Sequence, residues 1–183
     1  MGIQKFAIGV DIGGGHISAA AVDLSNNTII RESVSENPVD NQGSAEIILS
    51  VWAETIRSSI SFIGLENLKG IGFGIPAPFD YVNGIALFEN VLKYEGLYNV
   101  NVGGEMRKLL EIPEHIPIRF INDATAFGLG EDWVGKGEAY SRVIALALGT
   151  GFGNVFVEDG IPVVNGDLVP RIGAVWHLPF KDS

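Results

Sequence analysis

A run of three glycines follows an aspartate near the start of the chain, in the stretch VDIGGGHISAAAVD. Gly13, Gly14 and Gly15 have no side chains, so their successive N–H groups can converge on an anion that approaches closely. Asp11 is placed to hold a magnesium ion through water, because Mg²⁺ usually keeps several waters and binds one or two carboxylates plus phosphate oxygens. These residues predict a site for a metal-bound phosphate.

A second glycine-rich turn, LGTGFG, also lies between two apolar runs. Here Gly149 and Gly151 would offer backbone amides, and Thr150 would add a hydroxyl. Neither turn is followed by the lysine of a Walker loop, and neither opens a helix as dinucleotide-binding glycines do. Two such turns facing each other across a cleft would clamp a triphosphate. The alternative is that both are tight hairpins in which glycine serves only the turn geometry.

The pair Asn122-Asp123 stands between an apolar run and a helical pattern. Phosphoryl transfer to a hydroxyl needs a group that accepts the proton, and the Asp123 carboxylate can do so. The Asn122 amide both donates and accepts hydrogen bonds, which suits a neutral polyol. Asn and Asp are equally favoured as helix N-caps, so the residues alone leave both interpretations open.

The composition narrows the class of protein. Apolar residues make up 46% of the 183, which predicts a buried core and not disorder. The formal net charge is −10 and the 12 Lys and Arg are scattered, which excludes the basic surface of a nucleic-acid-binding protein. There is no cysteine for disulfides or thiolate catalysis. Without a membrane-length apolar segment or a signal peptide, we expect a cytoplasmic protein with no membrane partner.

The pattern of apolar residues predicts the elements that position these groups. Three strands form an antiparallel meander, a long amphipathic helix capped by Ser44 comes next, and strands and helices then alternate. The expected strands are 5–11, 16–23, 28–34, 70–75 and 118–121, and the expected helices are 44–63, 103–111 and 124–133. This βββαβαβα order predicts an α/β lobe with a mixed five-stranded sheet that contains one antiparallel strand.

The arrangement at the N-terminus then recurs, with strands at 142–148 and 154–157 around the second glycine turn. We therefore place a domain boundary at 135–141. Residues 1–137 would form the first lobe, with the first phosphate loop and the polyol site, and 138–183 the incomplete beginning of a second, similar lobe.

Five motifs, in order along the chain, resemble those of the ROK sugar kinases. They are DIGG, the strand that ends in Asp23, GFGIPAPFD, INDATAFGLGE and LALGTGFGNVFVEDG, and the resemblance runs from about Phe6 to His177. That family belongs to the actin–hexokinase superfamily, whose lobes are ribonuclease-H-like, in agreement with the predicted order of elements. The resemblance implies phosphorylation of a hexose, glucose or a close relative, with ATP and Mg²⁺.

The resemblance also implies roles for individual residues. Asp11, Gly13 and Gly14 match the first phosphate loop, and Asp123 matches the catalytic base. The second phosphate loop is matched by Gly149, Thr150 and Gly151, and the sugar-binding positions by Asn90, Asn122 and His177. The resemblance leaves open whether the protein forms a homodimer.

Two residues depart from the family pattern. Gly15 stands where a Thr or Ser usually helps to bind phosphate, and Ala174 stands where a sugar-binding glutamate is expected. The second departure favours an alternative, a ROK-like sugar-binding or regulatory protein without useful catalysis. Because the zinc site of many relatives is built from cysteines, we expect no structural zinc. Family members are considerably longer, so we also expect this chain to be a fragment with low activity alone.

Overall fold

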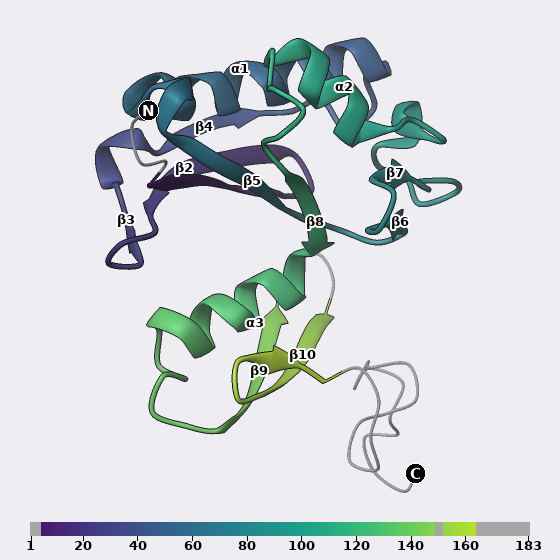
Figure 1. The fold of residues 1–183 in the computed structure, drawn as a ribbon. Helices are drawn as coiled ribbons and strands as arrows, with labels where there is room; N and C mark the ends of the chain where they lie inside the picture. The colour runs from purple at the N-terminus through teal and green to yellow at the C-terminus, as the bar shows by residue number, and fades with distance from the viewer. Residues whose placement is uncertain (1–4, 149–151, 164–183) are drawn as a thin grey trace, which may run out of the picture. The chain divides into compact units, whose positions relative to one another are not determined.

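A computed structural model describes residues 5–148 and 152–163 (Figure 1). The chain divides into two compact units, 1–122 and 123–183. The elements of the first unit are β1 (Phe6–Ile12), β2 (His16–Asp23), β3 (Thr28–Ile29), β4 (Ser35–Pro38), α1 (Ala45–Ile63), β5 (Leu68–Ile75), β6 (Phe79–Asp80), β7 (Ile85–Ala86), α2 (Val102–Leu109) and β8 (Ile118–Asn122). Short 3-10 turns lie at Arg31–Ser33, Leu65–Asn67 and Glu95–Leu97.

The main sheet of the first unit has the strand order β3-β2-β1-β5-β8, and β4 also pairs with β2. Strand β2 runs antiparallel to β1, β3 and β4, whereas β5 is parallel to both β1 and β8. The sheet is therefore mixed, with one strand opposed to the others, as the order of elements predicts. It has six strands instead of five because the expected strand at 28–34 is formed only at Thr28–Ile29 (β3), and after a 3-10 turn a further strand, β4, follows the expected range.

A buried serine explains that break. The Ser33 hydroxyl donates to the Ile30 carbonyl at 2.6 Å and accepts from the Ala21 N–H at 2.7 Å. The Ala21 amide is thus satisfied by a side chain and not by a continuous strand, and the backbone of Arg31–Ser33 turns as a 3-10 helix. From α1, the Ser59 hydroxyl donates to the Ser33 carbonyl at 2.8 Å and holds the turn in place.

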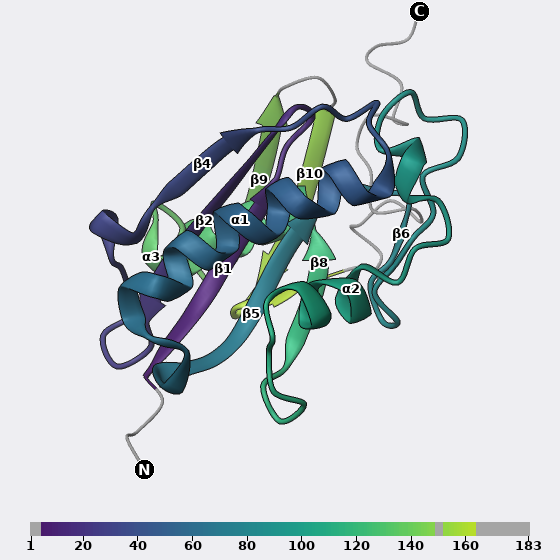
Figure 2. The same ribbon diagram turned by 90° about the horizontal axis from the view of Figure 1, so that it is seen from above.

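Helix α1 lies along one face of the sheet, where it contacts β1 and β2 (Figure 2). The Ser44 hydroxyl accepts from the Ile47 N–H, which confirms the predicted N-cap, and Gly64 ends the helix with a φ of 79°. The four residues expected on the apolar face, Ile48, Trp52, Ile56 and Ile60, are all buried. Helix α2 lies on the same face as α1 (Figure 1).

The hairpin of β6 and β7 was not expected from the sequence. Its turn is shaped by Asp80, whose carboxylate accepts from the N–H groups of Val82 and Asn83 and from the Asn83 side chain. These hydrogen bonds, above all those from Asn83, hold the pKa of Asp80 below its usual value. Gly84 closes the turn with a φ of 72°, a left-handed conformation that favours glycine.

The described part of the second unit consists of α3 (Asp123–Val134), β9 (Arg142–Leu148), β10 (Phe152–Glu158) and β11 (Ile161–Pro162). The three strands form an antiparallel sheet, and α3 packs on β9 and β10. The division at 122/123 thus groups α3 with the second sheet, while the limits 1–137 and 138–183 stay a prediction for the whole protein. No helix in the described residues has both the length and the apolar character needed to cross a membrane.

We expect Ser33→Ala to lower the free energy of unfolding by about 1–3 kcal/mol, because it leaves the buried Ala21 N–H without its acceptor. Urea unfolding measures the change. Ser58→Ala is the control, since it removes a hydroxyl from an exposed position on α1. Equal stability of the two variants would contradict the role given to Ser33.

Candidate active site

The carboxyl ends of β1, β5 and β8 meet at one edge of the first sheet. Strand pairing sets Asp11 beside Gly74 and Ile75 beside Asn122. Asp11 and Asn122 are therefore two strands apart at nearly the same height, which corresponds to about 10 Å between their backbones. In open α/β sheets, ligands bind in the crevice outside this edge.

The first glycine turn follows β1 at this edge. The Gly13 N–H donates to the His16 carbonyl at 3.0 Å and closes the hairpin. Among the glycines that the structure describes, left-handed φ angles occur at Gly64, Gly84 and Gly160, and so not in this turn. A methyl group at Gly15 would meet no atom closer than the Val39 carbonyl oxygen at 4.0 Å. Backbone conformation and protein packing therefore do not require glycine at position 15.

All three glycine carbonyls of the turn accept hydrogen bonds from the rest of the unit. The Gly13 carbonyl accepts from the Tyr94 hydroxyl at 2.6 Å, and the Gly15 carbonyl accepts from the Val39 N–H at 2.9 Å. The Gly14 carbonyl accepts from the Asn41 side-chain amide. Within the described ranges, the N–H groups of Gly14 and Gly15 donate to no partner, and both residues are exposed. The turn thus directs its acceptors inward and leaves two donors for an anion.

Tyr94 supports the turn from the buried side, a role that was not expected from the sequence. Its side chain is fully buried, and its ring packs against Trp52 and Phe88. Burial, together with the negative charge of Asp11, raises the pKa of Tyr94 to about 12. The phenol therefore keeps its proton near neutral pH and remains a hydrogen-bond donor to Gly13.

Asp11 is exposed beside the turn and supplies the carboxylate of the predicted magnesium site. In the part of the chain that the structure describes, no three His, Cys, Asp or Glu residues gather as a metal cluster. A site for Mg²⁺ next to phosphate needs only one or two carboxylates, because waters and phosphate oxygens complete the octahedron. Asp11 supplies one such carboxylate, and the neighbouring turn would hold the phosphate.

Asn122 is the last residue of β8, and its side chain is hydrogen-bonded to a tyrosine. Its amide donates to the Tyr81 hydroxyl at 3.4 Å, and that hydroxyl donates to the Ile75 carbonyl at 3.1 Å. Tyr81 therefore fixes Asn122 to the end of the neighbouring strand β5. The aromatic residue at the end of PAPFDY in the sequence is the only signal for this contact.

Asn90 is exposed and has a φ of 56°. Asparagine tolerates this left-handed conformation better than most residues. It lies in the same segment as Tyr94, and so the predicted sugar contact and the phosphate turn are linked through that tyrosine.

Asp123 is the first residue of α3 and is half-buried. Its carboxylate accepts from the Ala124 N–H at 2.9 Å, as expected of an acidic residue in the first turn of a helix. Accepting a hydrogen bond from a backbone N–H does not prevent a carboxylate from acting as a base, so this local role is compatible with the predicted one. Four predicted site residues, Gly149, Thr150, Gly151 and His177, lie outside the described residues, as does Ala174.

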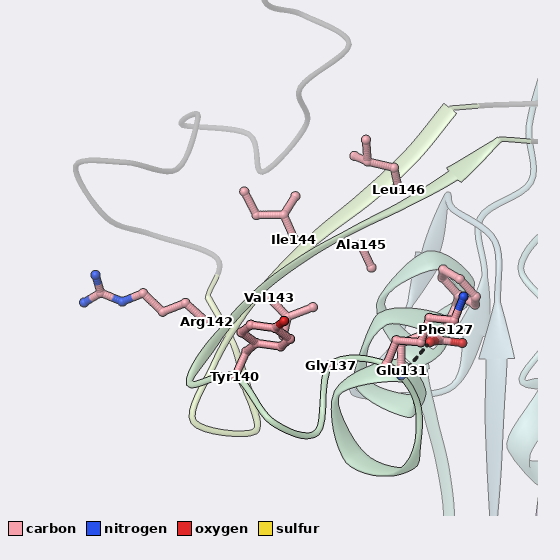
Figure 3. Close-up of a pocket in the computed structure, with 10 residues that line it drawn as sticks. Phe127, Glu131, Gly137, Tyr140, Arg142, Val143, Ile144, Ala145 and Leu146 are labelled. Carbon is pink, nitrogen blue, oxygen red and sulfur yellow. Dashed lines mark hydrogen bonds between the residues drawn. The ribbon is translucent and has the colours of Figure 1, made fainter.

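A separate hollow of about 560 Å³ lies within the second unit, between α3 and β9 (Figure 3). Phe127 and Glu131 of α3 line it, together with β9 and the segment that precedes this strand. Along β9, Val143 and Ala145 point toward α3, whereas Ile144 and Leu146 point to the other side of the strand (Figure 3). Among the residues that the structure describes, none of the predicted site residues lines this hollow.

Comparison with known proteins supplies the family. The sequence model described as ROK family matches residues 7–175. The chain belongs to the ROK family. It is 32% identical over 160 residues to a glucokinase of Thermotoga maritima, an alignment that covers 87% of this chain and 47% of that protein. It is 30% identical over 152 residues to an N-acetyl-D-glucosamine kinase of Vibrio parahaemolyticus, covering 83% of this chain and 46% of the relative.

Solved ROK structures share the fold. A ROK family glucokinase from Streptomyces griseus, crystallised with glucose and AMPPNP, has a TM-score of 0.67 and 25% identity, covering 88% of this chain and 47% of that one. The ROK resemblance seen in the motifs and the α/β fold predicted from the order of elements are thus confirmed. The ROK chain described here spans about half the length of the curated relatives that it matches.

The segment of Tyr94 packs tightly on the segment before α1, which yields a prediction about the support of the turn. A methyl group at Gly96 would overlap the Gly43 carbonyl oxygen. We expect Gly96→Ala to lower the free energy of unfolding by about 1–3 kcal/mol, the usual cost of overpacking. Urea unfolding provides the measurement.

Gly72→Ala is the matched control, because a methyl group there meets no atom within 4 Å. A Gly96 variant as stable as the Gly72 variant would show that the two segments are not in tight contact.

Proposed function

We propose that the whole protein transfers the terminal phosphoryl group of ATP to a hydroxyl of a hexose, glucose or a close relative. The observation that carries this proposal is the turn after β1, whose three carbonyls are held inward while the amides of Gly14 and Gly15 face solvent. Kinase relatives that act on glucose and on N-acetylglucosamine support it. A cytoplasmic location stays a prediction from the sequence.

The turn would bind phosphate oxygens through the Gly14 and Gly15 amides. Asp11 would hold Mg²⁺ through water, and the ion, when bound, neutralises negative charge on the phosphates. In a chain with a formal net charge of −10, backbone dipoles and a metal ion replace the basic side chains that otherwise hold phosphate. The second loop, Gly149–Gly151 by the ROK pattern, would supply further amides and the Thr150 hydroxyl.

The acceptor hydroxyl would lie against Asp123, which takes its proton as the sugar oxygen attacks phosphorus. Asn122, oriented by Tyr81, would bind a neighbouring sugar hydroxyl, and Asn90 and His177 would bind others. Positioning and charge neutralisation supply most of the rate enhancement in phosphoryl transfer, and the base provides the path for the proton.

A second candidate is a ROK-like sugar-binding or regulatory protein that keeps the sugar site without useful catalysis. Ala174 favours it, because a carboxylate acceptor for sugar hydroxyls is missing where the family pattern expects one. Calorimetric titration with glucose and N-acetylglucosamine, beside a coupled assay of ADP release, separates the candidates. Sugar binding without turnover in a chain of the relatives' full length would favour the second.

Asp123→Asn keeps the shape of the side chain and removes its basicity. We expect kcat to fall about 10²- to 10⁴-fold, the usual contribution of a general base, with the fold unchanged by circular dichroism. Asp132→Asn makes the same substitution later on α3 and should leave kcat within a factor of about two, because this residue lies roughly 13 Å further along the helix from Asp123. A variant at 123 that retains more than a tenth of the turnover would exclude Asp123 as the base.

The assay needs a chain extended to the length of the relatives beside the 183-residue chain. Kinases of this kind close two lobes over both substrates to exclude water, so we expect little or no turnover from the shorter chain. Equal activity of the two would overturn that expectation and leave the assignment of Asp123 unaffected.

Gly15 offers a test of the phosphate turn itself. Because a side chain fits there, we expect Gly15→Thr to fold normally and to bind AMPPNP more tightly, by about two- to tenfold for one added hydrogen bond. Gly15→Val has the same shape without the hydroxyl and should show no gain. Identical affinities for the two variants, measured by calorimetry, would mean that the position does not face phosphate.

A further inference from the structure

The first glycine turn, residues 13–15, is contacted by two segments that are distant from it in sequence: residues 39–43 and residues 88–97. We infer that Tyr94 is a positioning residue for phosphate binding, which fixes the Gly13 carbonyl inward and ties the turn to the segment that carries Asn90. The inference rests on the proposed function only in assigning a nucleotide phosphate to the turn.

The first step is the placement of the Tyr94 hydroxyl. Its hydrogen bond to the Gly13 carbonyl, at 2.6 Å, joins residues that are 81 positions apart. The Trp52 ring lies edge-on to the Tyr94 ring with centroids 5.6 Å apart, and Phe88 lies 5.7 Å away on a tilted plane. Because the side chain is fully buried between these rings, it has no alternative position, and the hydroxyl fixes the direction of the Gly13 peptide.

The second step is the backbone of the tyrosine. Tyr94 has a φ of 59°, a left-handed conformation that is unfavourable for a bulky side chain. Its N–H donates to the Asn41 carbonyl at 2.7 Å, and its carbonyl accepts from the Leu97 N–H at 2.9 Å. A strained backbone that the surrounding contacts hold in place is typical of sites where geometry serves function.

The neighbouring residues tie the same segments together. The Gln42 side-chain amide donates to the Leu92 carbonyl at 2.6 Å, and the Asn41 side-chain amide donates to the Gly14 carbonyl. Within the loop, the Glu95 carboxylate accepts from the N–H groups of Val91 and Leu92 at 3.1 Å each. Residues 90–95 are therefore fixed by hydrogen bonds within the loop and by hydrogen bonds from the segment before α1. Through its hydrogen bond to Gly13, Tyr94 connects this ordered loop to the phosphate turn.

A peptide group has its carbonyl and the following N–H on opposite sides. When Tyr94 holds the Gly13 carbonyl toward the core, the Gly14 N–H of the same peptide must point outward. Asn41 sets the Gly15 N–H in the same way through the Gly14 carbonyl. The two free donors of the turn are thus oriented by two side chains that do not themselves touch phosphate.

Tyr94→Phe tests the inference, because it removes the hydroxyl and keeps the ring between Trp52 and Phe88. In the ¹⁵N-labelled 183-residue chain, we expect the amide signals of Gly14 and Gly15 to move without any ligand. Affinity for AMPPNP should fall about two- to tenfold, as for the loss of one hydrogen bond. Asn41→Ala, a second variant outside the core, should shift the Gly15 amide signal in particular.

Tyr98→Phe is the matched control, since it removes the same atom from an exposed side chain and should change neither measurement. A purely structural role for Tyr94 would lower the stability of the phenylalanine variant but leave its affinity for AMPPNP unchanged when folded. Unchanged turn amides or unchanged affinity would therefore overturn the inference. If a wild-type chain extended to the length of the relatives binds AMPPNP at no concentration, the nucleotide assignment fails, and the amide signals of the 183-residue chain still decide whether Tyr94 orients the turn.

Discussion

The parallel pairing of β5 with both β1 and β8 is the constraint on which the candidate site depends. It brings the ends of three strands to one edge, although β1 and β8 are separated by more than half of the chain. The antiparallel β2 then determines how the chain leaves β1, because a hairpin into β2 requires a tight turn at that same edge. A one-residue shift in either pairing would change the face on which each strand's side chains meet those of its neighbours and would displace Asp11 relative to Asn122.

Glycine alone does not make an anion site, and the turn after β1 shows what else is needed. Every buried peptide group must find a partner, so the direction of each N–H depends on where the preceding carbonyl is satisfied. Here a phenol, a side-chain amide and a backbone N–H satisfy the three glycine carbonyls. The directions of the free N–H groups are therefore set by residues around the turn, and the phosphate site proposed for this acidic protein would need no cluster of basic side chains.

Much of the fold follows from periodicity, because long strands and a long amphipathic helix have strong patterns; β2, β9 and α1 match their expected ranges closely. The strand expected at 28–34 failed because the pattern does not reveal that the Ser33 hydroxyl replaces a backbone partner. The β6–β7 hairpin was overlooked although Asn83-Gly84 is a strong turn signal. The Tyr94–Gly13 contact could not be predicted, since it joins residues 81 positions apart and no local pattern encodes it.

Strand β9 is apolar on both sides, which has a consequence for how the chain behaves in solution. Its outward residues Ile144, Leu146 and Leu148 are 62%, 50% and 83% exposed, and strands apolar on both faces normally lie between two layers. Such a surface favours adhesion between molecules, and the formal net charge of −10 opposes it through mutual repulsion. The colloidal stability of the 183-residue chain therefore depends on its charge, and both added salt and mild acid should weaken it.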